Sequence, residues 1–191
     1  MDKTVRAIGY AMLNETESAS AESYADITWL KSEDEGCRSF KADPKGELNE
    51  IYADGIAVRS DLPNSGYDIT LTTIDALDDV RSDWYGVEKK GTNGLLETNK
   101  NNKLKRFALL EVREDEYGKF KTTVYYYCNI AKRLSDESKT DEGAKFDPIF
   151  PEHSLVSRPR PSDGAVRFSN VYTTLAAAKM SKVPEPTDAT E

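Results

Sequence analysis

The sequence predicts a mainly β, antiparallel fold of the sandwich or barrel-like kind, with one short helix beside the sheet. Residues 67–72 alternate apolar and polar side chains, which is the period of a strand with one buried face. Residues 105–114 and 119–130 are two further strand-like stretches. The four residues between them, Asp115-Glu116-Tyr117-Gly118, indicate the turn of a hairpin. Residues 75–85 instead have the apolar spacing of a short helix. These observations together favour a sheet flanked by one helix.

The predicted helix has sequence signals at both ends. Asp75 is expected to be the N-cap, and Asp78 lies in the first turn, where negative charge suits the helix dipole. Gly86 is expected to end the helix in a left-handed conformation. The apolar residues of one side are Leu77, Val80 and Trp84. A helix with one apolar side is predicted to pack on the sheet.

The first third of the chain predicts further strands separated by polar segments. Residues 3–13 are expected to form the first strand, and residues 14–22 a polar loop. Residues 27–31 are expected to form a short second strand whose hairpin partner is residues 37–42. Residues 43–46, Asp-Pro-Lys-Gly, indicate a turn.

Two segments in the middle of the chain are predicted as loops. The first is a long loop over residues 46–66, in which residues 48–58 allow either one bent strand or two strands interrupted near Asp54-Gly55. The second is a flexible loop over residues 87–104, which is rich in asparagine, glycine and lysine. Its lysines have no aromatic residue among them, so a solvated loop is favoured over a nucleic-acid patch.

The end of the chain predicts one more hairpin and a tail. Residues 154–158 and 165–171 are expected to pair across the turn of residues 159–164. Residues 173–180 have helical propensity, but they are too few to form a stable helix alone. Residues 1–180 are therefore predicted to form one domain, and residues 181–191 a disordered or assembly-ordered tail.

Composition restricts the class of protein. The formal net charge of −8 argues against binding to the nucleic acid backbone, which depends on basic residues that neutralise phosphates. The sequence has no apolar run long enough for a transmembrane helix and no apolar leader, so we expect no membrane insertion and a cytoplasmic location before any assembly. Cys37 and Cys128 are expected to stay reduced, although the sequence leaves a disulfide open.

Several short motifs, taken in their order, carry a resemblance to a known family. These motifs are Tyr52-Ala53-Asp54-Gly55-Ile56, Asn64-Ser65-Gly66-Tyr67, the alternating strand with its helix ending at Gly86, Phe107-Ala108-Leu109-Leu110, Tyr125-Tyr126-Tyr127-Cys128-Asn129 and Arg158-Pro159-Arg160-Pro161-Ser162-Asp163-Gly164. In this order and spacing the chain resembles the major tail tube proteins of long-tailed (siphovirus-type) bacteriophages, over residues 4–172.

The resemblance implies a structural virion protein. It implies hexameric rings that stack into a non-contractile tail tube, with a channel through which DNA passes into the host without specific binding. The expected partners are other copies of the chain and the tape-measure, tail-tip and tail-terminator proteins, with no cofactor and no metal. The expected locations are the host cytoplasm during assembly and then the virion.

The resemblance also places the contacts between subunits in the long loop and the chain ends. The subunit-interaction candidates are Tyr52, Asp54, Arg59, Asp61 and Asn64. Acidic residues near this loop are candidates for the channel wall, since a conduit that repels DNA weakly suits its passage. These candidates are Glu47, Glu50 and Asp68.

Two alternatives use other features of the sequence. A β-sandwich module of a virion or cell surface would present residues 59–66 or the tyrosine run to a carbohydrate or receptor, although packing within strands is the commoner use of such tyrosines. A small acid–base hydrolase needs two placed carboxylates, but the many acidic residues form no organising motif. The single histidine, His153, lies in no nucleophile motif, so the sequence predicts no enzyme.

Overall fold

The computed structural model describes residues 4–14, 22–33, 36–53, 56–92, 94–99, 104–137 and 148–185, without the side chains of residues 53, 57 and 58. Strands make up 49% of the described residues and helices 8%, and all strand pairs among them are antiparallel. The predicted mainly β fold with one short helix is therefore confirmed.

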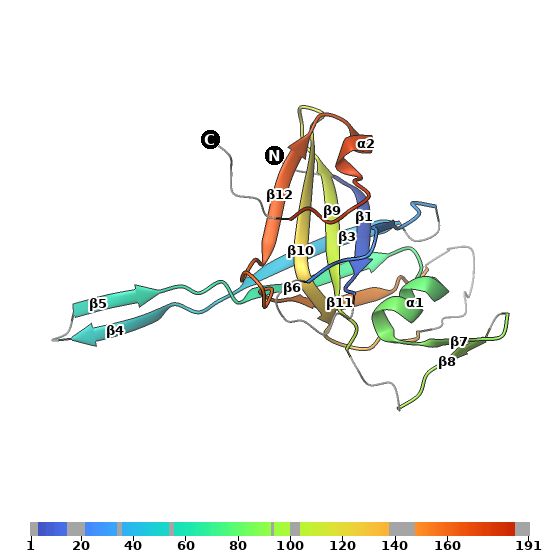
Figure 1. Cartoon of the computed structure of the whole chain (residues 1–191), viewed down its shortest axis with the longest axis horizontal. Helices are drawn as coiled ribbons and strands as arrows, with labels where there is room; N and C mark the ends of the chain where they lie inside the picture. Colours follow the sequence, from blue (N-terminus) through green and yellow to red (C-terminus); the bar gives the residue numbers. More distant parts are fainter. Residues whose placement is uncertain are drawn as a thin grey trace.

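One eight-stranded sheet forms the body of the molecule (Figure 1). Its strands, in spatial order, are β2 (Thr28–Trp29), β1 (Thr4–Met12), β9 (Phe107–Glu114), β10 (Phe120–Ile130), β11 (Glu152–Ser157), β6 (Gly66–Thr73) and β3 (Cys37–Lys45), and β12 (Arg167–Tyr172) pairs with β10. The sheet thus joins strands from both ends of the sequence. Of the three hairpins that the sequence predicts, the one present is that of β9 and β10.

Strand β10 connects the two halves of the sheet because it changes partners along its length. Its first part lies between β9 and β12, and its last two residues pair with β11. A β-bulge between Tyr125 and Cys128, with Tyr127 at φ 51°, redirects the strand. The bulge turns Cys128 to the side of Tyr125, whereas the strict alternation of a regular strand would place it on the face of Val124 and Tyr126.

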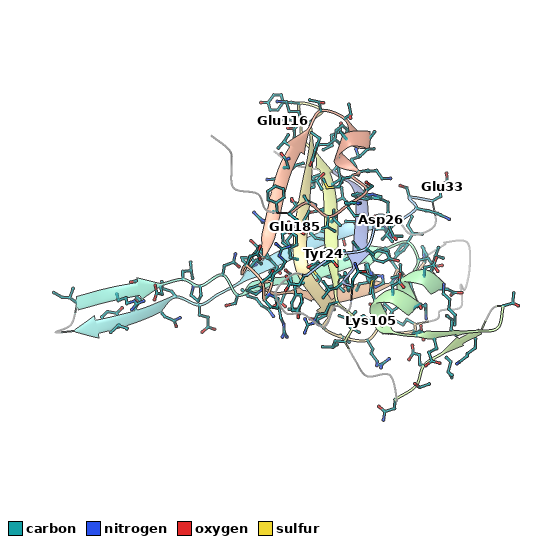
Figure 2. All side chains as sticks on the ribbon, in the orientation of Figure 1. Tyr24, Asp26, Glu33, Lys105, Glu116 and Glu185 are labelled. Carbon is teal, nitrogen blue, oxygen red and sulfur yellow. The ribbon has the colours of Figure 1, made fainter. Side chains whose placement is uncertain are left out.

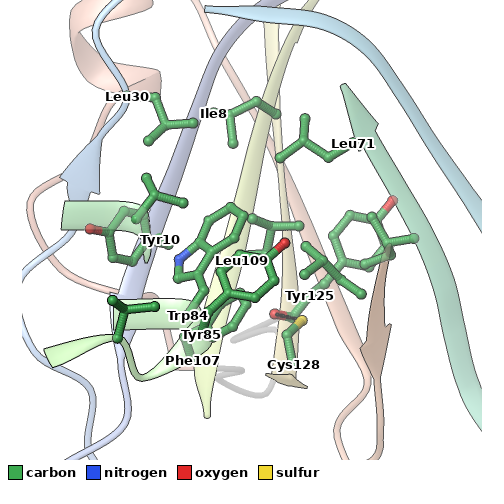
Figure 3. Close-up of a cluster of buried hydrophobic side chains, with 14 residues drawn as sticks. Ile8, Tyr10, Leu30, Leu71, Trp84, Tyr85, Phe107, Leu109, Tyr125 and Cys128 are labelled. Carbon is green, nitrogen blue, oxygen red and sulfur yellow. Dashed lines mark hydrogen bonds between the residues drawn. The ribbon is translucent and has the colours of Figure 1, made fainter. Parts of the chain in front are cut away.

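The main core lies between these two halves. Side chains of β1, β9 and β10 meet those of β6 and β11, and helix α1 (Asp78–Tyr85) covers one end of the cluster. The Trp84 ring of α1 stacks on Phe107 at 5.0 Å between centroids, and Tyr10 meets Trp84 edge-on at 5.4 Å (Figure 3). Such aromatic pairs add about 0.5–1.5 kcal/mol beyond the area that they bury. This stacking fixes α1 against the sheet.

Helix α1 differs from the prediction at its N-terminus and agrees with it at its C-terminus. The N-cap residue is Leu77, which has no side-chain oxygen, and Asp75 Oδ1 instead accepts a hydrogen bond from the Ala76 N–H at 2.7 Å. Asp75 is therefore not the N-cap. Gly86 adopts the left-handed conformation at φ 68°, and its N–H donates to the carbonyl of Ser82 at 3.1 Å, as predicted.

The predicted pairing of residues 27–31 with residues 37–42 is wrong. Strand β2 pairs with β1, and β3 pairs with β6 along its whole length. Residues 43–45 continue β3 instead of forming a turn. Phe40 and Ala42 pack against the core while Lys41 and Asp43 are exposed. This alternation continues the strand through Asp43-Pro44, the pair that in sequence resembles the start of a turn.

The predicted last hairpin is also wrong, although both of its strands exist. Strand β11 pairs with β6 and with the end of β10, whereas β12 pairs with the first part of β10. The two strands therefore join different halves of the sheet. The turn between them is closed by a hydrogen bond from the Arg160 N–H to the Ala165 carbonyl at 2.9 Å.

The C-terminal segment packs on the sheet as far as residue 185, within the tail of residues 181–191 that the sequence predicts as disordered or assembly-ordered. Helix α2 (Leu175–Ala178) begins after Thr174, whose side chain accepts from the Ala177 N–H. After it, the carbonyl of Ser181 accepts from the Ile27 N–H at 2.9 Å, and that of Pro184 from the Tyr126 hydroxyl at 2.6 Å. Figure 2 labels Glu185 beside the sheet. Residues 186–191 of the predicted tail lie outside the described residues.

Candidate assembly surface

The segment predicted as a long loop contains a β-hairpin that projects from the body (Figure 1). Its strands are β4 (Asn49–Ala53) and β5 (Ile56–Asp61), which form a two-stranded sheet separate from the main sheet. Of the two interpretations that the sequence allows for residues 48–58, two strands is the correct one. The hairpin continues directly from β3 and β6, which are neighbours in the main sheet.

Two glycines fix the neck of the hairpin. A Cβ on Gly46 would lie 2.2 Å from the carbonyl oxygen of Pro63, and one on Gly66, where φ is +114°, would lie 2.0 Å from that of Ser157. Real Cβ atoms do not approach a carbonyl so closely, so both positions require glycine. The Ser65 N–H donates to the Lys45 carbonyl at 3.0 Å across the neck.

The hairpin exposes large apolar side chains on both strands and beside them. Each is between 58% and 69% exposed, and they are Leu48, Ile51, Tyr52, Ile56 and Leu62. A two-stranded ribbon in water has no core to bury such residues and is marginally stable alone. Clustered apolar side chains on a surface indicate a contact site for another molecule. The one sequence signal for these residues is their position among acidic and polar neighbours, which by itself does not separate an exposed strand residue from a buried one.

Most of the predicted subunit-interaction residues lie on this hairpin. Tyr52 is on β4 and donates its hydroxyl to Glu50 Oε2 at 2.6 Å, which raises the pKa of Tyr52. Arg59 and Asp61 are on β5 and form an exposed ion pair at 3.1 Å. Asn64 is at the neck, where its Oδ1 accepts from the Gly66 N–H. Asp54 lies outside the described residues.

The predicted channel-wall residues are not brought together. Glu47 and Glu50 belong to the hairpin region, whereas Asp68 is on β6 in the main sheet, where it pairs with Lys45 at 2.7 Å. Asp68 belongs to an exposed polar face of β3, β6 and β11. Cross-strand neighbours on that face are Asp43 opposite Asp68, Lys41 opposite Thr70, and Glu152 opposite Thr72. Such a face is mixed in charge and has no apolar cluster of the hairpin's kind.

The second segment predicted as a loop, residues 87–104, also contains a hairpin. Its strands are β7 (Glu88–Lys90) and β8 (Gly94–Leu96), which lie beside α1 (Figure 1). Lys89 forms an ion pair with Asp79 of α1, and Lys90 pairs with Glu88 at 2.8 Å. Gly91 therefore lies in the turn of a small hairpin rather than in an irregular loop.

The single histidine of the chain is a buried structural residue. His153 on β11 is 1% exposed, with Nδ1 2.8 Å from the Tyr85 hydroxyl and Nε2 3.1 Å from Thr73 Oγ1. Trp84 meets the imidazole edge-on at 5.2 Å. Burial, with a smaller contribution from the charge of Arg81, lowers the pKa of His153 from 6.5 to about 4. The imidazole joins α1 to the sheet and stays neutral at neutral pH.

The tyrosine run does not form a platform for a sugar ring. Tyr125 and Tyr126 are buried, and the ring of Tyr127 is covered by the guanidinium of Arg106 at 4.1 Å. Arg160 lies over the Tyr126 ring at 4.6 Å. The Arg160 guanidinium also bonds Glu185 at 2.9 Å. These contacts use the faces of the aromatic rings within the protein.

Other site chemistry can be reported only for the described part of the chain. Within it, no three His, Cys, Asp or Glu side chains gather as metal ligands would, and no helix is long and apolar enough to cross a membrane. Cys37 and Cys128 are both free thiols. Burial raises the pKa of each thiol to about 12.

Comparison of the chain with family models, curated proteins and solved structures gives no match.

Proposed function

We propose that this protein is a structural subunit that polymerises as stacked hexameric rings into the tail tube of a long-tailed phage. Its location in the finished particle is the virion, and the tube is the conduit for DNA ejection. The single observation that carries this proposal is the projecting β4–β5 hairpin, which exposes five large apolar side chains away from the core. The order of family-like motifs gives the kind of assembly.

The apolar hairpin supports polymerisation because its exposed surface is costly for a monomer. Removal of apolar surface from water stabilises a contact by about 25 cal/mol per Å². A hairpin inserted against another copy would bury side chains that the subunit itself leaves exposed. The contact would also support a two-stranded ribbon that is marginal alone. Assembly thus accounts for a segment whose described side chains add nothing to the core of the single chain.

The open ends of the sheet support lateral contacts within a ring. Strand β3 is nine residues long and stands at one end of the strand order, and β12 borders β10 in the other half. Edge strands present backbone donors and acceptors to any neighbouring strand. Pairing between copies would close these edges into a continuous barrel around a channel.

The exposed polar face of β3, β6 and β11 suits the wall of such a channel. It carries Asp43, Asp68 and Glu152 together with Lys41 and Lys45. Mixed charge with an acidic excess keeps the DNA backbone from binding to the wall. Asp68 is the wall candidate of this face, and Glu47 and Glu50 belong instead to the contact hairpin.

The test is assembly of the purified full-length chain. Negative-stain electron microscopy and sedimentation at rising protein concentration, alone and with tail-tip components, are expected to show tubes of constant width with a regular axial repeat. Particles that stay dispersed under all these conditions would contradict the proposal.

A pair of matched variants separates assembly from folding. Ile51→Ser with Ile56→Ser removes two exposed apolar side chains of the hairpin, and Tyr117→Ser removes an exposed aromatic residue of the β9–β10 turn. Both variants are expected to keep the thermal midpoint of the wild-type chain. Only the hairpin variant is expected to lose sedimenting tubes, since Tyr117 lies away from the contact hairpin.

A further inference from the structure

The face of the sheet that points away from the main core is covered by the chain that follows α2. This outer face carries a second apolar cluster on β9 and β10, and its buried members are Ala108, Leu110, Val124 and Tyr126. Met180 and Val183 pack against this cluster. We call residues 180–185 the strap, and Figure 1 shows the chain after α2 crossing β9 and β10. The strap thus keeps apolar surface of the body out of water.

The first half of the strap is held by the segment that contains β2. Trp29 Nε1 donates to the Met180 carbonyl at 3.0 Å, and the Ile27 N–H donates to the Ser181 carbonyl at 2.9 Å. Strand β2 stands at one end of the strand order. The strap therefore also occupies a backbone donor beside an edge strand, and unpaired donors at such an edge would be free to bond other chains.

The second half of the strap is held by two side chains of the body. The Tyr126 hydroxyl donates to the Pro184 carbonyl at 2.6 Å, and Arg160 Nη1 donates to Glu185 Oε2 at 2.9 Å. Residues 180–185 belong to no helix and no strand, so no ladder of backbone bonds adds to these contacts. Each single hydrogen bond contributes little, because water replaces it when the strap opens.

Arg160 is placed so that the strap can leave without stranding a buried charge. Its side chain is 4% exposed and lies over the Tyr126 ring at 4.6 Å. Its Nε donates to Asp163 Oδ1 at 3.0 Å, and Glu22 Oε2 is 3.8 Å away. Both of these carboxylates belong to the body, whereas Glu185 belongs to the strap. Opening therefore costs only the contacts of the strap itself, since Arg160 keeps carboxylate partners in either state.

We propose that the strap is a salt-sensitive switch that opens and closes as a unit over the outer face, with Arg160 and Tyr126 holding it closed. In the open state the apolar cluster and the Ile27 N–H face water, while the pairing of β1, β9 and β10 is unchanged. A segment held by few contacts opens at a lower free energy than the whole fold. Because Glu185 is 59% exposed, dissolved salt screens its attraction to Arg160 and favours opening. The strap acts within one chain, so the switch goes beyond the proposed function and does not depend on whether the chain forms tubes.

Amide hydrogen exchange followed by NMR tests the switch at single residues in the purified, dispersed chain. The Ile27 N–H bonds to the strap, whereas the Leu30 N–H bonds to the Ile8 carbonyl of β1 at 2.9 Å. The protection factor of Ile27 is expected to be about tenfold or more below that of Leu30, because only the strap must open to expose Ile27. A rise in sodium chloride from about 50 mM to about 500 mM is expected to lower the Ile27 value about twofold relative to Leu30.

Two variants each remove one contact of the strap and keep the shape of the side chain. Tyr126→Phe and Glu185→Gln are each expected to lower the Ile27 protection factor about twofold to tenfold relative to Leu30. Glu185→Gln is also expected to abolish the response to salt. Asp163→Asn is the matched control, since it removes a carboxylate that bonds Arg160 within the body and no contact of the strap. This control is expected to keep the wild-type response to salt.

Equal protection of Ile27 and Leu30 in the wild type would overturn the proposal, because the strap would then open only when the whole fold unfolds. A wild-type Ile27 protection factor that does not respond to salt, or one that neither Tyr126→Phe nor Glu185→Gln lowers relative to Leu30, would overturn it as well. Electron microscopy of the same protein decides the proposed function separately, since a chain that never forms tubes still shows or lacks this exchange behaviour.

Discussion

The buried His153 makes the stability of this fold depend on pH in a window that can be calculated. Its pKa is about 4 in the folded chain and about 6.5 when unfolded, so between these values the unfolded chain binds a proton that the folded chain excludes. The free energy of unfolding therefore falls as the pH is lowered from 6.5 to 4. The full loss is about 3 kcal/mol, since each pKa unit corresponds to about 1.4 kcal/mol.

The loss of unfolding free energy arises from the contacts that His153 makes with α1. Because the Thr73 hydroxyl donates to the Asp75 carbonyl, Nε2 donates to Thr73 Oγ1 and the neutral Nδ1 accepts from the Tyr85 hydroxyl. A protonated imidazole cannot accept that hydrogen, and it places a charge beside Trp84 in a core with little access to water. Both contacts hold α1 on the sheet. Above pH 6.5 the neutral imidazole is present in both states, and this contribution to stability is complete.

The assay uses the fact that the chain has one histidine. Its imidazole proton resonances are expected to stay constant from pH 8 to pH 5 in the folded protein. The free energy of unfolding, measured in urea, is expected to fall between pH 7.5 and pH 4.5 in both proteins. The fall is expected to be about 2–3 kcal/mol larger in the wild type than in the variant His153→Gln, whose side chain does not titrate. The carboxylates titrate in both proteins, so the difference isolates the histidine. An imidazole titration midpoint near 6.5, or equal pH dependence in both proteins, would refute this reasoning.

The remaining predictions concern packing, backbone conformation and thiol chemistry. Trp84→Ala is expected to lower the free energy of unfolding by about 3–5 kcal/mol in urea titrations, and a loss below 1 kcal/mol would mean that α1 is not docked as described. Gly66→Ala is expected to cost about 2–3 kcal/mol because its new Cβ meets a backbone carbonyl of β11, whereas Gly86→Ala has open space and is expected to cost only the left-handed strain of about 1–2 kcal/mol; equal costs would contradict the close approach. Cys37 and Cys128, with pKa values raised to about 12, are expected to react slowly with a disulfide reagent at pH 8 and quickly in denaturant, and rapid reaction of both in the native protein would show that neither thiol is protected.

Local patterns predicted the elements better than their partners. Alternation placed β6, and apolar spacing with Gly86 placed α1 and its end, because both signals depend on residues close in sequence. The partner of β3 could not be found in this way, since its neighbour β6 lies beyond the whole projecting hairpin. The bulge at Tyr127 has no local signal and redirects β10, which separates β11 from β12. Long-range pairing of this kind is decided by the sheet as a whole.

The sequence predicts where in the chain the candidate assembly surface lies, but not that exposed apolar side chains form it. The sequence predicts that Tyr52, Arg59 and Asp61 belong to a contact loop, and they lie on the projecting hairpin. The sequence does not single out the exposed Ile51 and Ile56, because an apolar residue in a predicted strand is normally assigned to a core. Only the structure shows that this hairpin has no core behind it.

The direct continuation of β3 and β6 into the hairpin determines how the molecule responds to mechanical force. A pull on the tip acts along both strands and loads the ladder between β6 and β11 in shear, from Tyr67 opposite Ser157 to Thr72 opposite Glu152. Hydrogen bonds loaded in shear must break together, whereas a hinge would let them open one at a time. The arm therefore behaves as a tether rooted in the sheet.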